Sequence, residues 1–200
     1  MSKSVLIGPA ALLLALSVAP AAEAFTLSLV PQSSSVTSGS NVVVDVVASG
    51  LTDFAAPSLG AYDLNVQYDT NALTVTQVSF GTGLDPLGLG GLNDLDFSTP
   101  GVLNAFELSF DSAEALNSLQ PGAFTLFTVT FNATSYGATL LGLSVNALSS
   151  GAGTSLTADA LNGATVNVVP LPAAGWLLLS GLGALGGLVR RNPMVREALA

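Results

Sequence analysis

The stretch AYDLNVQYDTNALTVTQVSFG, residues 61–81, decides the fold. Its first half alternates apolar and polar residues, which is the pattern of a β-strand with one buried face and one exposed face. The apolar positions are Tyr62, Leu64, Val66 and Tyr68, and the polar positions are Asp63, Asn65 and Gln67. In the second half the alternation slips by one residue at Thr76 and Gln77, which predicts a β-bulge.

The same strand pattern recurs along the chain. Segments rich in Val, Leu, Phe, Tyr and Thr are separated by clusters of Gly, Ser, Asn, Asp and Pro, as short strands are separated by turns. The predicted strands cover residues 25–30, 42–48, 61–68, 73–80, 102–110, 124–131, 139–145 and 164–169. Because no long helical period is present to cover a parallel sheet, we expect one all-β domain, an antiparallel β-sandwich of eight or nine strands with a short helical turn at residues 112–119.

The first 24 residues have the features of a secretory signal peptide. Lys3 precedes an apolar run at residues 5–19, and Ala22 and Ala24 form a small-x-small cleavage site. A transmembrane anchor is the alternative, but the run is short and the helix-breaking Pro20 precedes the cleavage triplet. We therefore expect export, with the chain cut before Phe25.

Charge is distributed very unevenly. The four basic residues lie in the two ends, and residues 25–169 carry eleven acids and no Lys or Arg, which is a formal charge of −11. Such a surface repels phosphate, so nucleic-acid binding is excluded. The chain also has no Cys and no His, which rules out a disulfide framework and argues against zinc or thiol chemistry.

The C-terminal segment begins with Val169, Pro170, Leu171, Pro172 and Ala173. An apolar run of 17 residues, 173–189, follows and is closed by Arg190 and Arg191. As a helix it would be about 25 Å long, near the lower limit for crossing a bilayer, and the Arg pair predicts a cytoplasmic end. The chain thus divides into a signal peptide (1–24), a β-sandwich (25–168) and a C-terminal segment (169–200) with a predicted transmembrane helix.

Two parts of the β-sandwich carry a family resemblance. Residues 61–81 resemble the cohesin pattern of an alternating strand, Tyr-Asp, a short turn, then Leu-x-Val-x-x-Val and Gly, and PGAFTLFTVTF (121–131) is similar to the family's later Gly-initiated strand. The resemblance implies a nine-stranded jelly-roll sandwich, related in fold to carbohydrate-binding modules. It also implies a module that binds an extracellular protein or a polysaccharide. No motif carries the contact surface of cohesins, so no partner-binding residues follow from the resemblance.

The C-terminal segment resembles the PEP-CTERM sorting signals of Gram-negative bacteria, in the variant written VPLPA. Residues 169–173, the apolar run and the Arg pair match that pattern, with Leu171 in place of the Glu of the commoner form. The resemblance implies an inner-membrane intermediate held by the C-terminal helix and recognised by an exosortase-type membrane protease. The final location would be the cell surface or an extracellular matrix, for example in a biofilm.

Candidate chemistry is sparse. In the Gly-rich stretch 81–96, expected as a loop, Asp94 and Asp96 with Asn93 could offer oxygen ligands to Ca²⁺, and a solvated loop without metal is the alternative. No other cofactor is expected. Glu107 is expected to point outward from its strand, and the acids show no spacing that singles out a catalytic pair. We therefore expect a non-catalytic exported protein, the alternative being a secreted glycoside hydrolase or its carbohydrate-binding accessory module.

Overall fold

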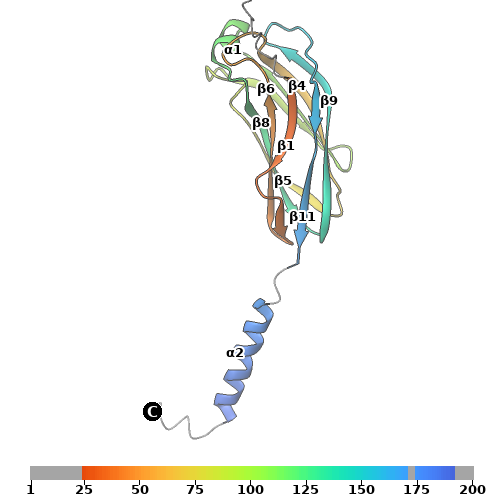
Figure 1. Cartoon of the computed structure of the whole chain (residues 1–200), viewed down its shortest axis with the longest axis vertical. Helices are drawn as coiled ribbons and strands as arrows, with labels where there is room; N and C mark the ends of the chain where they lie inside the picture. The colour runs from red at the N-terminus through yellow and green to blue at the C-terminus, as the bar shows by residue number, and fades with distance from the viewer. Residues whose placement is uncertain (1–23, 171–173, 192–200) are drawn as a thin grey trace, which may run out of the picture.

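The computed structural model describes residues 24–170 and 174–191. Two β-sheets pack face to face (Figure 1), which confirms the expected all-β sandwich. In spatial order, the five-stranded sheet contains β10 (Ala160–Asn162), β1 (Thr26–Pro31), β3 (Asn41–Ser49), β8 (Phe124–Ala133) and β5 (Leu73–Phe80). The six-stranded sheet contains β2 (Ser35–Thr37), β11 (Ala164–Val169), β9 (Gly137–Ser150), β4 (Leu59–Gln67), β7 (Val102–Ser109) and β6 (Gly91–Asp96).

All eight predicted strands are present, and three short ones were missed. β2 and β10 have three residues each, too few to show an alternation, and they form the two parallel pairs, β11–β2 and β1–β10. β6 was missed because its sequence, GLNDLD, is polar and follows several glycines. The expectation that residues 81–96 form a loop is therefore wrong for residues 91–96, which pair antiparallel with β7.

Two local predictions are confirmed. The pairing of β5 with β8 shifts register between Val75 and Gln77, as the slipped alternation predicted. The helical turn is α1 (Ala113–Leu119), which begins after Ser112, whose hydroxyl accepts a hydrogen bond from the Ala115 amide. This is N-capping by a side-chain oxygen, which satisfies a backbone donor that the first helical turn leaves free.

The core lies between the two sheets. Its buried apolar residues run from Phe25 to Val168, and α2 (Ala174–Arg191) is not among the elements that supply them. At its centre the Tyr62 ring stacks on Phe127 of the opposite sheet, with centroids 5.8 Å apart. Because this core is complete within residues 25–168, we expect the sandwich to fold without the flanking segments.

Glu107 points into the core, so the expectation that it points outward from its strand is wrong. Its strand alternates as expected but with the opposite parity, so that Leu103, Ala105 and Glu107 face the core while Phe106 and Leu108 face outward. Glu107 is only 5% exposed. Its position is tolerated because a hydrogen-bond donor is available inside the sandwich, which no pattern along a single strand reveals.

That donor is Tyr62, the residue directly opposite Glu107 in the β4–β7 pairing. The Tyr62 hydroxyl donates a hydrogen bond of 2.7 Å to Oε2 of Glu107. Burial raises the pKa of Glu107, the hydrogen bond from Tyr62 opposes that rise, and the charge of Asp85 adds to it. Burial, together with the charge of Glu107, also raises the pKa of Tyr62 far above its usual range.

The C-terminal segment continues from β11 through residues 171–173, which lie outside the described residues, as does Ala22 of the cleavage site. Residues 174–191 form the helix α2. Among the helices of the described residues, none combines the length and apolar character that a membrane crossing requires. The transmembrane helix expected over residues 173–189 is therefore not found.

Replacing Glu107 with Gln should stabilise the sandwich at about pH 7 and change little at about pH 4. The raised pKa means that the folded state keeps the Glu107 proton to a higher pH than the unfolded state, so the free energy of unfolding falls as pH rises through that interval. Gln removes the charge and keeps an acceptor for the Tyr62 hydroxyl. Thermal unfolding of residues 25–169 at both pH values measures the effect.

Tyr62→Phe is the comparison variant. It leaves the buried Glu107 carboxylate without its donor and should lower the free energy of unfolding by about 1–3 kcal/mol at neutral pH. A Glu107→Gln variant that melts at or below the parent's temperature at neutral pH would contradict this account of the buried pair.

Candidate functional site

The outer face of the six-stranded sheet is the candidate functional site. The register that buries Tyr62, Leu64 and Val66 of β4 turns Asp63 and Asn65 outward. On one side, β7 places Asn104 beside Asn65 and Phe106 beside Asp63. These two adjacent strands therefore present their polar and apolar residues in register on one surface.

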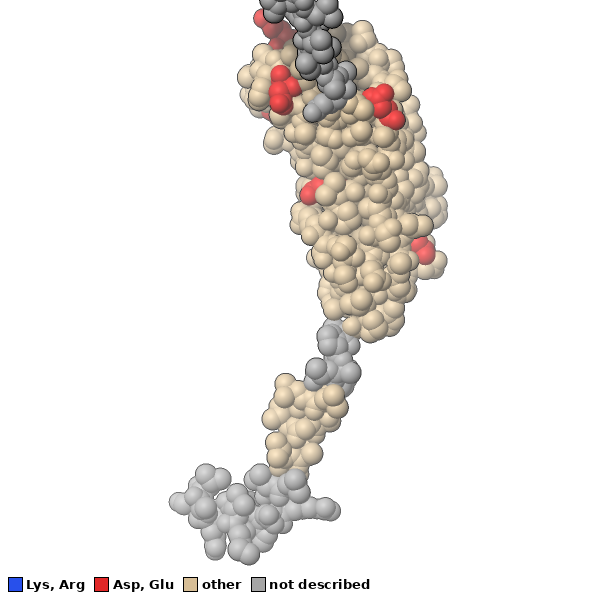
Figure 2. Space-filling view, viewed as in Figure 1, with Lys and Arg blue, Asp and Glu red and all other residues tan. Residues whose placement is uncertain are grey.

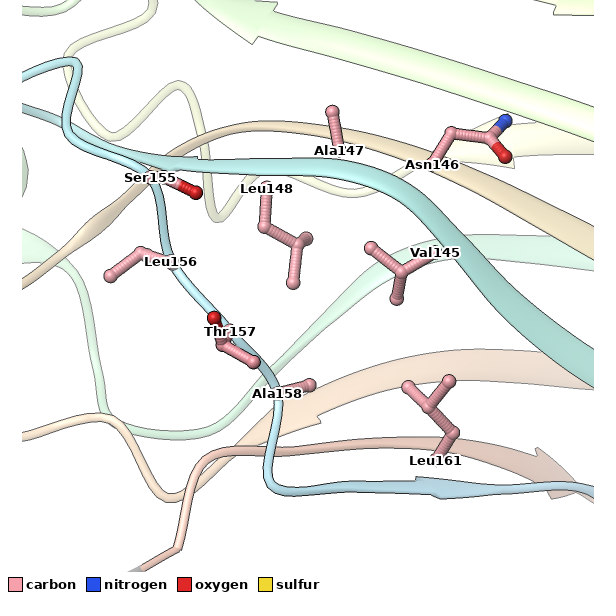
Figure 3. Close-up of a pocket in the computed structure, with 9 residues that line it drawn as sticks. All are labelled: Val145, Asn146, Ala147, Leu148, Ser155, Leu156, Thr157, Ala158 and Leu161. Atoms are coloured by element: carbon pink, nitrogen blue, oxygen red, sulfur yellow. The ribbon is translucent and has the colours of Figure 1, made fainter.

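A β-bulge in β9 completes this face. Asp63 pairs with Ala147 while the next residue, Leu64, pairs with Val145, so Asn146 is the extra residue. Figure 3 shows Val145 and Leu148 pointing to one side of β9, and Asn146 and Ala147 pointing to the other. Bulges commonly re-aim a side chain in this way. The bulge delivers Asn146 to the outer surface beside Asp63.

The inward side of the same bulge borders a pocket of about 290 Å³ between β9 and residues 155–161 (Figure 3). Leu148 belongs to the core, and Val145, Leu156 and Ala158 pack against it. This pocket is therefore an edge of the core and gives no separate site.

Four outward residues, Asp63, Asn65, Asn104 and Asn146, form what we call the amide cluster. Asn104 Nδ2 donates to Oδ1 of both Asp63 and Asn65, the latter at 3.0 Å. Asn146 Nδ2 donates to Asp63 Oδ1 at 3.0 Å, and Asn65 Nδ2 donates to Asn146 Oδ1 at 3.0 Å. These bonds hold the side chains of three strands in one arrangement, which lowers the entropy that a partner must remove on binding.

The amide cluster borders a hollow of about 390 Å³. Asp96 of β6 lines the same hollow, together with Thr99 and Val102. Hydrogen bonds from the backbone and the hydroxyl of Ser98 lower the pKa of Asp96, so this carboxylate is ionised at neutral pH. The hollow thus offers carboxylate and amide oxygens and, like the whole of residues 25–169, contains no Lys or Arg.

Apolar residues continue the face toward the other end of β7. Leu92 pairs with Leu108, and both are exposed, while Phe106 lies between Leu108 and the amide cluster. We call Leu92, Phe106 and Leu108 the apolar strip. Next to it, Leu87, Leu89 and Phe110 are 53%, 63% and 60% exposed. An exposed apolar patch bordered by polar residues is typical of a protein interaction site.

The two Ca²⁺ candidates lie on this face, and Asp96 shares its hollow with one other acid, Asp63. Asp94 and Asp96 are exposed on β6, opposite Phe106 and Asn104 of β7. Both oxygens of Asp96 accept hydrogen bonds from Ser98. Within residues 24–170 and 174–191, no group of three or more acidic, His or Cys side chains gathers in a way that could hold a metal ion.

A second hollow, of about 370 Å³, lies at the end of the sandwich where β11 ends. Its lining includes Asp69, Asn71, Tyr136 and Thr139. Tyr136 is 65% exposed, whereas Thr139 is buried and its hydroxyl has no hydrogen-bond partner among the residues that the structure describes. An exposed ring beside a carboxylate and an amide can contact both the C–H face and the hydroxyls of a sugar.

Of the sequence-predicted sorting residues, Val169 lies at the end of the sandwich that carries the second hollow. Val169 ends β11, where its carbonyl accepts a hydrogen bond from Ser38, and Pro170 is exposed after it. Arg190 and Arg191 end α2. Ala24 is exposed just before β1, and the next residue, Phe25, is buried.

The sequence did not predict that the four residues of the amide cluster lie together. The outward positions of Asp63 and Asn65 followed from alternation, but Asn104 was not singled out and β9 was expected to end at Val145. The signal present in the sequence was the occurrence of two Asn residues, Asn65 and Asn104, on separate strands. Nothing along the chain marks the bulge at Asn146, because its register is set by β4.

The acids themselves are dispersed. On the face seen in Figure 2 the acids form separate patches, and no Lys or Arg of the described residues appears there. A partner with basic groups would therefore meet a negative potential over a broad area, which favours encounter more than it fixes one contact.

No protein-family model matches this chain, and no curated protein sequence matches it. Solved cohesin structures do match its fold. The sixth cohesin of scaffoldin B from Acetivibrio cellulolyticus, solved with a Cel5 dockerin mutant, is 18% identical, with a TM-score of 0.58 over 73% of this chain and 99% of that one. A type II cohesin from the cellulosome of the same organism is 15% identical, with a TM-score of 0.58 over 72% and 95%.

A non-cellulosomal cohesin from the archaeon Archaeoglobus fulgidus is 20% identical, with a TM-score of 0.54 over 76% of this chain and 96% of that one. Almost the whole of each cohesin is thus covered by this chain. At such identities the likeness concerns the fold, so the chain folds as a cohesin-like β-sandwich.

Proposed function

We propose that this chain is a non-catalytic exported protein whose sandwich binds a protein partner through the outer face of β9, β4, β7 and β6. The observation that carries the proposal is the pre-organised amide cluster beside the apolar strip. The cohesin-like fold supports it, since several of the similar cohesins were solved in complex with dockerins.

The same geometry favours binding over glycoside hydrolysis. A hydrolase of this kind needs two carboxyl groups facing one substrate, one of them with a raised pKa to act as the acid. Asp63 and Asp96 line one hollow, but the pKa of Asp96 is lowered, and Asp63 is occupied by hydrogen bonds from two Asn side chains of the amide cluster. Glu107, whose pKa is raised, faces the core.

We also propose that the C-terminal segment sorts the protein. The VPLPA motif at residues 169–173, the helix and the terminal Arg pair support export, recognition by an exosortase-type membrane protease, and release to the cell surface or matrix of a Gram-negative bacterium. Membrane attachment through this segment belongs to the same proposal.

A specific observation favours a second ligand class, a neutral polysaccharide at the Tyr136 hollow. Tyr136 offers an exposed ring, and Asp69, which accepts from Asn71, keeps its second carboxylate oxygen free of any hydrogen bond within the described residues. The strongly acidic sandwich would repel an anionic polymer, so the candidate polymer is uncharged.

Leu108→Glu should abolish capture of a partner from the extracellular matrix of the source cells by immobilised residues 25–169. The change places a charge in the apolar strip, where its desolvation would oppose docking. Val30→Glu is the matched control, because Val30 is similarly exposed but lies on β1 of the other sheet. Capture that survives Leu108→Glu and is lost with Val30→Glu would contradict the proposed face.

No metal is proposed, so EDTA or added Ca²⁺ should leave capture unchanged.

Deleting residues 170–200 should release the sandwich freely into the medium, because the whole sorting segment after Val169 is then gone. Fractionation followed by immunoblotting measures the distribution. Replacing Pro170 and Pro172 with Ala keeps the segment's length and should retain the protein in the envelope unprocessed. Unchanged envelope retention of the deleted form would overturn the sorting proposal.

Tyr136→Ala should lower binding of residues 25–169 to neutral polysaccharides on a glycan array by about tenfold, the loss expected for one stacking contact of about 1.4 kcal/mol. Phe54→Ala is the matched control, since Phe54 is a similarly exposed ring outside this hollow. An array on which the parent binds no polysaccharide would remove this second function and leave the protein-binding proposal untouched.

A further inference from the structure

The start of β1 is held by two reciprocal hydrogen bonds. The Phe25 backbone nitrogen lies 2.9 Å from Asp159 Oδ2, and the Asp159 backbone N–H donates to the Phe25 carbonyl at 2.7 Å. From the next residue on, β1 and β10 pair in parallel, Thr26 opposite Ala160. This clamp therefore fixes where β1 enters the sheet.

The bond expected to be cut during export, Ala24–Phe25, lies immediately before this clamp. Ala24 is exposed and outside any strand, whereas Phe25 is buried in the core. Gly50 faces the bond, and a Cβ there would come within 2.0 Å of the Ala24 carbonyl oxygen. Glycine at position 50 therefore leaves room for the Ala24–Phe25 backbone, and the side chain of any other residue there would clash with it.

We infer that cleavage before Phe25 creates an α-ammonium group that forms an ion pair with Asp159 in the mature protein; the inference rests on the proposed export. Water adds across the Ala24–Phe25 peptide bond, leaving a carboxylate on Ala24 and an amine on Phe25. The amine is protonated at neutral pH, because the pKa of an α-amino group is about 8. The nitrogen that donates one hydrogen bond to Asp159 from an uncharged backbone N–H becomes a cation with three donors.

The charge balance of the sandwich makes this pair distinctive. Residues 25–169 hold eleven acids and no Lys, Arg or His, so the new ammonium is the one cation of the sandwich. Asp159 already lies at hydrogen-bond distance, so the ammonium adds the attraction between opposite charges to a hydrogen bond that is already in place. Processing thereby strengthens the attachment of β1 without moving any element.

The experiment compares residues 25–169 beginning at Phe25 with residues 24–169 beginning at Ala24, each released from a fusion by a protease that leaves a native first residue. Both keep the nitrogen of Phe25, but the second moves the charge one residue away, about 3.8 Å along the chain. We expect the Phe25 form to melt about 1–4 °C higher. Equal melting temperatures would overturn the ion pair, and neither result depends on a binding partner.

Asp159→Asn in both forms gives the matched test of the partner. It should remove the difference between the two N-termini, whereas Asp94→Asn, an exposed acid on the other sheet, should leave it intact. Intact-mass measurement of the exported protein should show Phe25 as the first residue. A different first residue would overturn the inference while leaving the capture experiments on the outer face unaffected.

Discussion

The register of β4 between β7 and β9 is the constraint on which the rest of the structure depends. It turns Tyr62, Leu64 and Val66 inward, where Tyr62 stacks on Phe127 and binds Glu107. The same register turns Asp63 and Asn65 outward to the side chains of Asn104 and Asn146. A slip of one residue would exchange the inward and the outward residues of β4, so it would disrupt both the core and the candidate binding face.

The absence of basic residues shapes how polar groups are satisfied. With no Lys or Arg in residues 25–169, carboxylates are held by amides, hydroxyls and backbone N–H groups instead of ion pairs. Asp63 accepts from two Asn side chains, Asp45 accepts from the Thr128 hydroxyl, and Asp53 accepts from the Gly122 amide. Such bonds fix geometry without neutralising charge, so the surface stays negative and open to a basic partner.

The sequence predicted the features that repeat along a strand. The sandwich and the bulge at Val75 and Gln77 follow from alternation and its slip, and the helical turn expected at residues 112–119 is present as α1. The sequence-based prediction failed at positions where pairing with another strand determines which way a side chain points. The parity of β7 was inverted because a buried Glu is allowed only by Tyr62 opposite it, and Asn146 was missed because its bulge exists only in the pairing with β4. β6 was missed because an edge strand needs little apolar sequence.

If the outer face of β9, β4, β7 and β6 is the surface that binds a protein, partner binding should protect it from hydrogen–deuterium exchange. Exchange of residues 25–169 is measured with and without the captured partner. We expect slower exchange in β4, β6, β7 and β9 around Asn65, Asn104 and Asn146, with β5 and β8 unchanged. Protection confined to β5, β8 and β3 of the other sheet would contradict it.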